Sequence, residues 1–293
     1  MASIAFHISV RWARLRRAHY AARLDQIASL GLPDGPEVPA TMVAFCGASD
    51  LPEQVASWRS YRIHVGRPRR TVMVSDGSLG AAEERILRRL EPRLELATLD
   101  GIAGDIATPM MRAYASAMPM GRKLLVMRWL ERLAPCIYAD SDILFYPEAA
   151  QLRDPAFWTA SEPRYLFDPY PSLDPRLLQN PDESADAVNG GFIVLKGPVA
   201  WADVLKRFDD HSGPFGFFTE QTLNHLAIRQ AGGVPLDRYR FVLRNEDQWA
   251  ATDWFAGPQV ILRHYISSLR HKMWLRVRQL PGSATTRHSP SAV

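Results

Sequence analysis

Two aspartates separated by a single residue, Asp140 and Asp142, are the residues of this sequence that most clearly suggest chemistry. They lie between two apolar runs, 134–138 and 143–146, which read as short buried strands. A carboxylate is costly to bury alone, so this pair requires a cation, a basic partner or water. Mg²⁺ and Mn²⁺ prefer carboxylate oxygens and leave positions open for phosphate. The pair therefore indicates either a metal site for a phosphate-bearing substrate or a solvated Asp-Ser-Asp turn.

The segments before this pair predict the framework that positions it. Residues 41–47 and 71–75 read as strands, and helical patterns separate them. This order predicts an α/β fold with an open, Rossmann-type, mostly parallel sheet, in which ligands bind at the carboxyl ends of the strands. Phe45, Gly47 and Asp76 lie at such ends. We expect them to line the same edge as the aspartates.

The remaining elements follow the same alternation. A helix is predicted over 123–133, directly before the aspartates, and a long irregular loop over 168–187. Long ordered loops are often functional, so this loop is a candidate acceptor-binding segment. Further elements are expected as a strand at 187–196, helices at 201–211 and 219–230, and a strand at 259–265. We expect residues 39–277 to form a single mixed α/β domain flanked by helices.

The two ends of the sequence differ from this core. Residues 1–38 are predicted to form an amphipathic helix, over 9–31, and a linker rich in Gly and Pro. The arginines on this helix allow two interpretations: it packs on the domain, or it lies on an anionic membrane surface. Residues 278–293 are rich in Ser, Thr and Pro, and we expect them to be disordered.

Composition limits the classes of protein that need to be considered. With 293 residues and 47% hydrophobic content, the chain can bury an ample core. Its net charge of +4 favours anionic ligands, but no motif of a known nucleic-acid-binding module is present. Cys46 and Cys136 lie in apolar runs and are expected to be buried free thiols. Without an apolar run of membrane length or a signal-peptide pattern, we expect a cytoplasmic protein, in solution or at the inner face of the membrane.

Taken in order, the motifs resemble those of nucleotide-sugar glycosyltransferases with the GT-A fold. The likeness is greatest to the retaining family 8 and its bacterial relatives, and it covers residues 41–275. The matching motifs are Arg122-Lys123, the run from Tyr138 to Asp142, Asn189-Gly190-Gly191, Glu220-Gln221, and His264 followed by Lys272 and Trp274. In that family the Lys stands six residues after the His, with a Gly between them. Here Lys272 is eight residues after His264, and Ser267 or Ser268 replaces the Gly.

The resemblance implies a metal and a nucleotide-sugar donor. Asp140, Asp142 and His264 would hold the metal, with His271 as the alternative histidine. An imidazole ligand favours Mn²⁺ over Mg²⁺. Lys272, together with Arg270, would add positive charge at the leaving phosphate. Other contacts to the donor, expected to be UDP-linked, would come from Phe45, Gly47, Asp76, Lys123 and Ser141, with Asp76 accepting hydrogen bonds from a base or ribose.

The same resemblance implies residues that act on the sugars. Asn189 and Gln221 would bind sugar hydroxyls, and Glu220 would orient a substrate or stabilise an oxocarbenium-like centre. Each has a simpler interpretation. Asn189-Gly190 is also a common turn dipeptide, Glu220 suits the first turn of any helix, and His264 could be an ordinary core histidine.

The predicted function is therefore transfer of a sugar from a nucleotide donor to a saccharide, lipid-linked or protein acceptor, with retention. Two alternatives remain. A metal-dependent nucleotidyltransferase would usually carry a basic, Gly-rich phosphate loop near the first strand, whereas residues 46–50 contain no Lys or Arg. A non-catalytic nucleotide-sugar-binding protein would be expected to lack a carboxylate or the histidine, and the sequence retains both.

Overall fold

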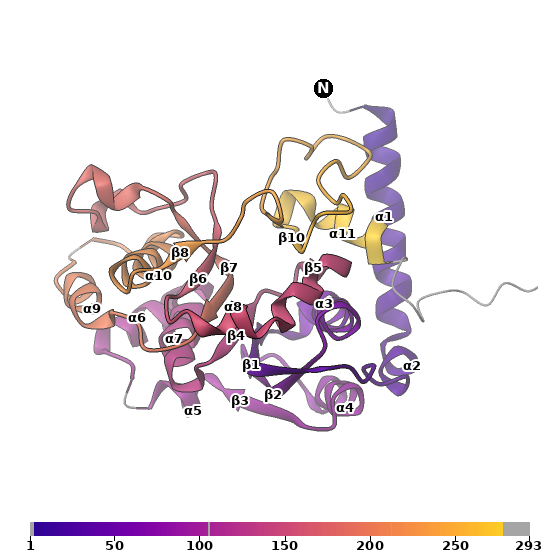
Figure 1. Ribbon diagram of the computed structural model, residues 1–293, viewed down its shortest axis with the longest axis horizontal. Coiled ribbons are helices and arrows are strands. Elements are labelled where there is room, and N and C mark those ends of the chain that lie inside the picture. The colour runs from indigo at the N-terminus through magenta and orange to yellow at the C-terminus, as the bar shows by residue number, and fades with distance from the viewer. Residues whose placement is uncertain (1–2, 105, 212, 278–293) are drawn as a thin grey trace, which may run out of the picture.

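The computed structural model of the protein describes residues 3–104, 106–211 and 213–277. This part of the chain contains a seven-stranded mixed sheet (Figure 1). Across it the strands follow the order β3 (Leu94–Thr98), β2 (Arg67–Ser75), β1 (Glu37–Cys46), β4 (Cys136–Ala139), β7 (Val188–Leu195), β6 (Arg164–Phe167) and β8 (Val234–Pro235). The first four strands are parallel, whereas β7 is antiparallel to both of its neighbours. The predicted α/β fold with a mostly parallel sheet is confirmed.

The strand register explains how polar residues far apart in the sequence reach one edge. β1 lies between β2 and β4, and all three run in the same direction. Cys46 at the end of β1 pairs with Ser75 at the end of β2. Gly47, Asp76 and Asp140 each follow immediately after one of these strands. The carboxyl ends therefore place them along one edge, as the sequence predicted.

A second, three-stranded sheet closes over this edge. It consists of β5 (Ile143–Phe145), β10 (Leu262–His264) and β9 (Phe241–Val242), in that order with β10 in the middle. β10 runs antiparallel to β5, with His264 opposite Ile143. The backbone N–H of Tyr265 donates to the carbonyl of Asp142 at 2.8 Å. This small sheet fixes the position of His264 beside the aspartates.

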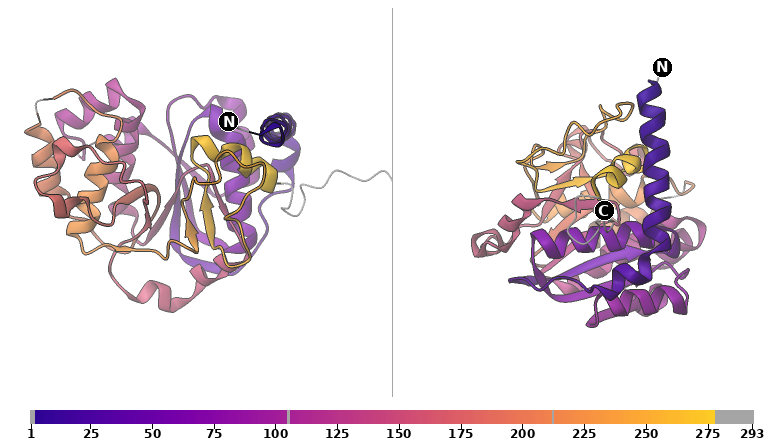
Figure 2. Two further views of the ribbon diagram at one scale, coloured as in Figure 1. Left: turned by 90° about the horizontal axis from the view of Figure 1, so that it is seen from above. Right: turned by 90° about the vertical axis from the view of Figure 1, so that its right-hand side faces the viewer.

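Helices cover both faces of the large sheet (Figure 2). Alternate residues of β1 explain this layering, because Met42 and Ala44 enter one core while Val43 enters the other. The first core is covered by α1 (Ile4–Ala22), α2 (Leu24–Ser29), α3 (Leu51–His64), α4 (Ala81–Leu90) and α11 (Arg270–Arg276). The second is covered by α5 (Leu99–Ala103), α6 (Pro109–Ala117), α7 (Pro119–Trp129), α9 (Trp201–Asp209) and α10 (Thr219–Gln230). The short α8 (Pro155–Thr159) lies between β5 and β6 in the chain.

The N-terminal segment forms two helices rather than the single helix predicted over 9–31. α1 begins at Ile4, where Ser3 Oγ accepts a hydrogen bond from the N–H of Phe6 at 3.1 Å. It packs beside α11, with the rings of Tyr20 and Trp274 5.2 Å apart. Its N-terminal part extends past the rest of the domain (Figure 2, right). The predicted linker is also shorter than expected, because β1 already begins at Glu37.

Three further expectations can be compared with the structure. Cys46 and Cys136 are buried free thiols, as predicted. Within the described ranges, no helix combines the length and apolar character needed to cross a membrane. The tail 278–293, predicted to be disordered, lies outside the described residues.

Candidate functional site

Asp140, Asp142 and His264 converge at the carboxyl edge of the large sheet. Each offers one ligand atom, and these three atoms lie within 4.8 Å of one another. Nε2 of His264 is 3.0 Å from Oδ1 of Asp142 and 3.7 Å from Oδ2 of Asp140. The structure thus brings together the three residues that the sequence offered as metal ligands.

Asn189 determines which nitrogen of His264 faces the aspartates. Its side-chain oxygen accepts a hydrogen bond from the N–H of Gly191 at 2.9 Å and lies 3.1 Å from Nδ1 of His264. An amide oxygen only accepts, so this network assigns the proton of a neutral imidazole to Nδ1. The lone pair of Nε2 then points at two carboxylates, where it needs a proton or a cation. This is the orientation of a metal-binding histidine held by an outer partner.

Two consecutive glycines in β7 leave room for the side chains around them. A Cβ added to Gly191 would lie 2.5 Å from Nδ1 of His264, closer than such atoms approach in real structures. A Cβ added to Gly190 would lie 3.3 Å from Oε1 of Glu220, which a small side-chain movement relieves. Glycine at 191 is therefore required by the position of the imidazole, whereas glycine at 190 places β7 close to Glu220.

Asp140 is held by groups on two other elements. Nζ of Lys123, from α7, donates to both of its carboxylate oxygens at 2.9 and 2.8 Å. The hydroxyl of Tyr138 donates to Oδ1 at 2.7 Å. Burial alone would lower the pKa of Lys123, but Asp140 and Glu220 outweigh it and raise that pKa. Lys123 is therefore a cation at the site.

Asp142 has its own cationic partner. Nε of Arg270 donates to its Oδ2 at 3.0 Å. Burial acts to raise the pKa of Asp142, but His264 and Arg270 lower it further than burial raises it. Asp142 is therefore ionised and paired with Arg270, and Asp140 forms its own ion pair with Lys123. Arg270 also contacts Asp50 at 3.0 Å, so two cations, Lys123 and Arg270, pair with the three carboxylates of Asp50, Asp140 and Asp142.

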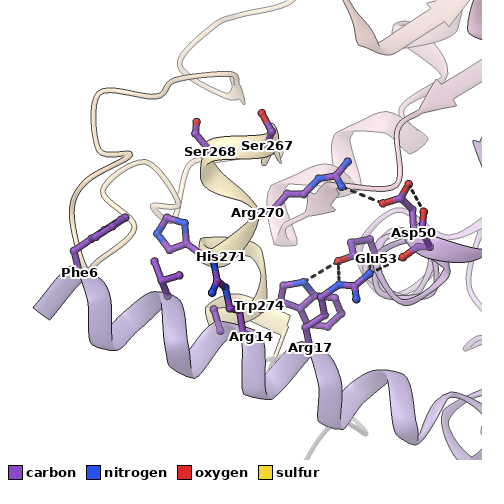
Figure 3. A pocket seen from close by; sticks show the side chains of 13 residues that line it. Phe6, Arg14, Arg17, Asp50, Glu53, Ser267, Ser268, Arg270, His271 and Trp274 are labelled. Atoms are coloured by element: carbon purple, nitrogen blue, oxygen red, sulfur yellow. Dashed lines mark hydrogen bonds and ion pairs between the residues drawn. The ribbon is translucent and has the colours of Figure 1, made fainter. Parts of the chain in front are cut away.

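A pocket of about 660 Å³ lies beside α1, and Arg270 is the residue that lines it and also contacts the cluster (Figure 3). Arg270 lies between the two, because its Nη1 contacts Asp50 of the pocket at 3.0 Å while its Nε contacts Asp142. The pocket lies among α1, the loop after β1 and the start of α11. Its polar and charged lining residues are Arg14, Arg17, Ser49, Asp50, Glu53, Ser267, Ser268, Arg270 and His271.

The resemblance placed Lys272 at the leaving phosphate and His271 as the alternative metal ligand, but neither residue belongs to the Asp–Asp–His cluster. Lys272 is fully buried, with Nζ 3.1 Å from Asp247, and it also donates to the carbonyl of Ala250 at 3.1 Å. The ring of His271 lies edge-on to Phe6, with centroids 5.4 Å apart, and is not part of the Asp–Asp–His cluster. The residue six positions after His264 is Arg270, which matches the family spacing and does contact the cluster.

Glu220 and Gln221 begin α10 on the other side of the aspartates. Burial raises the pKa of Glu220 to about 7, although Lys123 acts in the opposite direction. Nε2 of Gln221 donates to Oδ2 of Asp168 at 2.9 Å. Asp168 is buried and also bonded by Asn189, and burial raises its pKa.

The sequence analysis did not single out Asp168, which connects Gln221 to the Asn189–His264 pair. Its only signal was its place at the start of the long loop 168–187, where a buried carboxylate is unusual.

Four more candidates occupy the edge near the aspartates. The carboxylate of Asp76 lies against Gly47, where an added Cβ would be 2.6 Å from its Cγ, and it accepts hydrogen bonds from the N–H and the hydroxyl of Ser78. Phe45 is half-buried against the second core, and Ser141 is buried between the two aspartates in the chain. All four residues therefore lie near the aspartates, and their contact with a donor stays a prediction.

Known proteins resemble this chain in structure and not in sequence. No protein-family model and no curated protein matches this sequence. Solved structures do match, among them the galactosyltransferase LgtC in complex with donor and acceptor sugar analogs, with a TM-score of 0.53 at 10% identity over 84% of this chain and 96% of that one. Mouse xyloside xylosyltransferase 1 gives 0.50 at 12% identity, covering 80% and 99% of the two chains. GlyE of Streptococcus pneumoniae gives 0.52 at 13% identity, covering 82% and 60%. The chain has the GT-A fold.

The likeness to GT-A structures establishes the fold, and the chemistry has to be inferred from the residues of the site. At 10–13% identity, it does not distinguish family 8 from other groups with this fold. What this chain adds is the convergence of two carboxylates and one oriented imidazole at the edge where α/β sheets bind ligands.

Proposed function

We propose that this protein is a metal-dependent glycosyltransferase that moves a sugar from a nucleotide-sugar donor to a saccharide, lipid-linked or protein acceptor. One observation carries the proposal. Asp140, Asp142 and His264 converge at the carboxyl edge of a GT-A sheet, and Asn189 holds the imidazole with its free nitrogen toward the carboxylates. A turn or a core histidine would not require this arrangement.

The donor atoms suit a divalent metal. Two carboxylate oxygens and one imidazole nitrogen match Mn²⁺, our first choice, and also accommodate Mg²⁺. Asp140, Asp142 and His264 would hold the ion. Once bound, it would neutralise charge on the leaving diphosphate.

The ion pairs of Asp140 and Asp142 indicate how a donor diphosphate would bind. Asp140 is paired with Lys123, and Arg270 is shared by Asp142 and Asp50, so both aspartates of the cluster already have a cationic partner. A diphosphate would release these two cations from the carboxylates and accept their hydrogen bonds instead. Arg270 lies at the junction with the pocket beside α1 and can bind phosphate oxygens through two N–H groups. We therefore place the nucleotide along this pocket, whose volume is typical of ligand sites.

UDP is the donor nucleotide that we propose first, and the sequence resemblance is its only support. The same resemblance supports retention of configuration. Glu220 would face the sugar, since it lies beside Gly190 of β7 and interacts electrostatically with both Lys123 and Asp140. Gln221 and Asn189 would act with Asp168 on sugar hydroxyls or on the orientation of His264.

We propose that residues 39–277 form the catalytic domain and that the segment 1–38 is a helical extension packed on it. Arg17 of α1 makes a two-point ion pair with the buried Glu53 of α3, at 2.5 and 2.9 Å, which supports a fixed extension. A cytoplasmic location is supported by the two buried free thiols, Cys46 and Cys136, because disulfides are rare in reducing compartments.

Titration calorimetry of UDP into the protein, with Mn²⁺ and then with EDTA, tests the donor site. We expect binding that requires the metal and that falls by at least about 100-fold in the Asp140→Ala/Asp142→Ala variant. Asp182→Ala, which removes an exposed carboxylate from the loop 168–187, is the matched control and should bind as the wild type does.

Other outcomes are equally informative. If another nucleoside diphosphate binds in place of UDP, the metal site stands and the donor class changes. If no nucleotide binds with or without metal, the proposed function is wrong.

A further inference from the structure

α1 exposes a row of large apolar side chains on the side that faces away from the domain. Their positions follow the i, i+4, i+8, i+11 spacing that lines a single side of a helix. This outer strip consists of Ile4, Ile8, Trp12 and Leu15, which are 80%, 53%, 57% and 56% exposed. Such a row is unusual for a surface helix, whose solvent side is normally polar.

The opposite side of the same helix is the one that packs. Phe6, Ala13 and Tyr20, spaced seven residues apart, are buried against the domain. Arg17 fixes this side through its ion pair with Glu53. α1 therefore has two apolar sides. The domain covers one of them, and the outer strip is left facing outward.

The charge of α1 indicates what the outer strip meets. None of its 19 residues is Asp or Glu. Its arginines include Arg11, which is exposed, and Arg16, which is half-buried. With 3.6 residues per turn, these two lie on either side of the outer strip. An apolar strip between arginines matches the boundary between lipid headgroups and acyl chains.

We propose that the outer strip docks α1 flat on an anionic lipid surface. The apolar side chains would enter the boundary region of the bilayer, while the arginines contact anionic headgroups. A second copy of the chain suits the strip less well, because two such helices would bring their arginines together with no acidic residue on either to pair with them. At about 28 Å in length, α1 gives an extended contact.

This orientation has a consequence for the acceptor, which rests on the proposed function. Arg14 and Arg17 line the donor pocket from the inner side of α1. About one helix diameter, ~10–12 Å, therefore separates the pocket from the bilayer. Among the acceptors proposed above, a lipid-linked one fits this distance best.

Vesicle co-flotation of the full chain tests the docking surface directly. Phosphatidylcholine vesicles are compared with vesicles that also contain phosphatidylglycerol. We expect the wild type to float with the anionic vesicles, and Ile8→Ser/Trp12→Ser to lower the partition coefficient by at least about tenfold. Phe217→Ser removes an apolar side chain of similar exposure, 63%, from the segment between α9 and α10 and serves as the matched control.

Two measurements keep the result interpretable. Circular dichroism and UDP titration of the double variant should match the wild type, since the outer strip contacts neither the core nor the donor pocket. Light scattering in solution should give the same mass for both proteins.

The proposal is wrong if the wild type does not bind anionic vesicles, or if the double variant binds them as strongly as the wild type. It is also wrong if the wild type is a dimer that the double variant dissociates, because the strip is then a self-association surface. None of these outcomes depends on nucleotide binding, so the docking proposal and the proposed function can fail separately.

Discussion

Gly191→Ala is the single substitution that most directly challenges the role given to His264. The new methyl group would lie 2.5 Å from Nδ1 of the imidazole and 2.8 Å from the side-chain oxygen of Asn189. Because carbon and nitrogen atoms pack at about 3.5 Å or more, the ring must move by about 1 Å. The backbone of residue 191 does not resist an alanine, since it is not among the glycines with positive φ.

The expected loss of UDP affinity follows from how little the ligands of a metal site can be displaced. Ligand distances in such sites hold to about 0.2 Å, so a ring displaced by about 1 Å no longer serves as a ligand. We expect the affinity for UDP with Mn²⁺ to fall by about 10- to 100-fold. Overpacking should also lower the free energy of unfolding by about 1–3 kcal/mol.

Calorimetry of UDP with Mn²⁺, alongside thermal unfolding in EDTA, measures both effects. Gly190→Ala is the matched control. Its methyl group would lie 3.3 Å from Oε1 of Glu220, which yields with a small movement, so binding should stay within about twofold of the wild type. If Gly191→Ala is destabilised and yet binds as the wild type does, His264 is only a core histidine and the reasoning is refuted.

Two further substitutions test other parts of the site. Burial raises the pKa of Glu220 from 4.5 to about 7, so over this range the folded protein keeps a proton that the unfolded chain has lost. Stability therefore falls as the pH rises through this window, by up to about 3 kcal/mol, and Glu220→Gln should remove that loss. Urea unfolding in EDTA between about pH 5 and about pH 8 measures it, and a variant curve parallel to that of the wild type would contradict the assignment. Lys272→Met should cost at least about 2 kcal/mol of stability, because Asp247 and two carbonyls lose their buried donor, while UDP affinity of the folded variant is unchanged. A stable Lys272→Met variant that no longer binds UDP would restore Lys272 as a phosphate ligand.

Much of the fold was predictable from local pattern. β1, β2 and β4 have continuous apolar runs that end in Gly or Asp, so their carboxyl ends, and the polar residues there, could be placed from sequence. The parallel order followed from the helices between them. These are local signals, and the structure agrees with them.

The contacts that complete the site could not be predicted in the same way. They depend on the sheet of β5, β9 and β10. The predicted strands 143–146 and 259–265 contain β5 and β10, but β9 was not predicted, and strands of two or three residues carry no periodic pattern that sets their pairing. Only the order of motifs, read through a family resemblance, pointed to His264. Arg270 and Asp168 reach the cluster through contacts between residues far apart in the sequence, and the sequence analysis named Arg270 together with Lys272, which does not contact the cluster.

α1 shows why periodicity alone misled at the N-terminus. Because apolar residues occupy two opposite sides, they do not define the single apolar face that the pattern analysis seeks. The sequence therefore predicted a weak amphipathic helix starting at residue 9. Ser3 as a cap and Phe6 as a buried contact place the start earlier.

Release of UDP from UDP-sugars, measured with Mn²⁺ and in the absence of an acceptor, tests the central claim most directly. The account predicts slow hydrolysis of at least one UDP-sugar, which EDTA stops and which the Asp140→Ala/Asp142→Ala variant lacks. If UDP-sugars bind in a metal-dependent manner and none is hydrolysed or transferred to any saccharide, lipid-linked or protein acceptor, the protein is a binding protein and the claim of sugar transfer is contradicted.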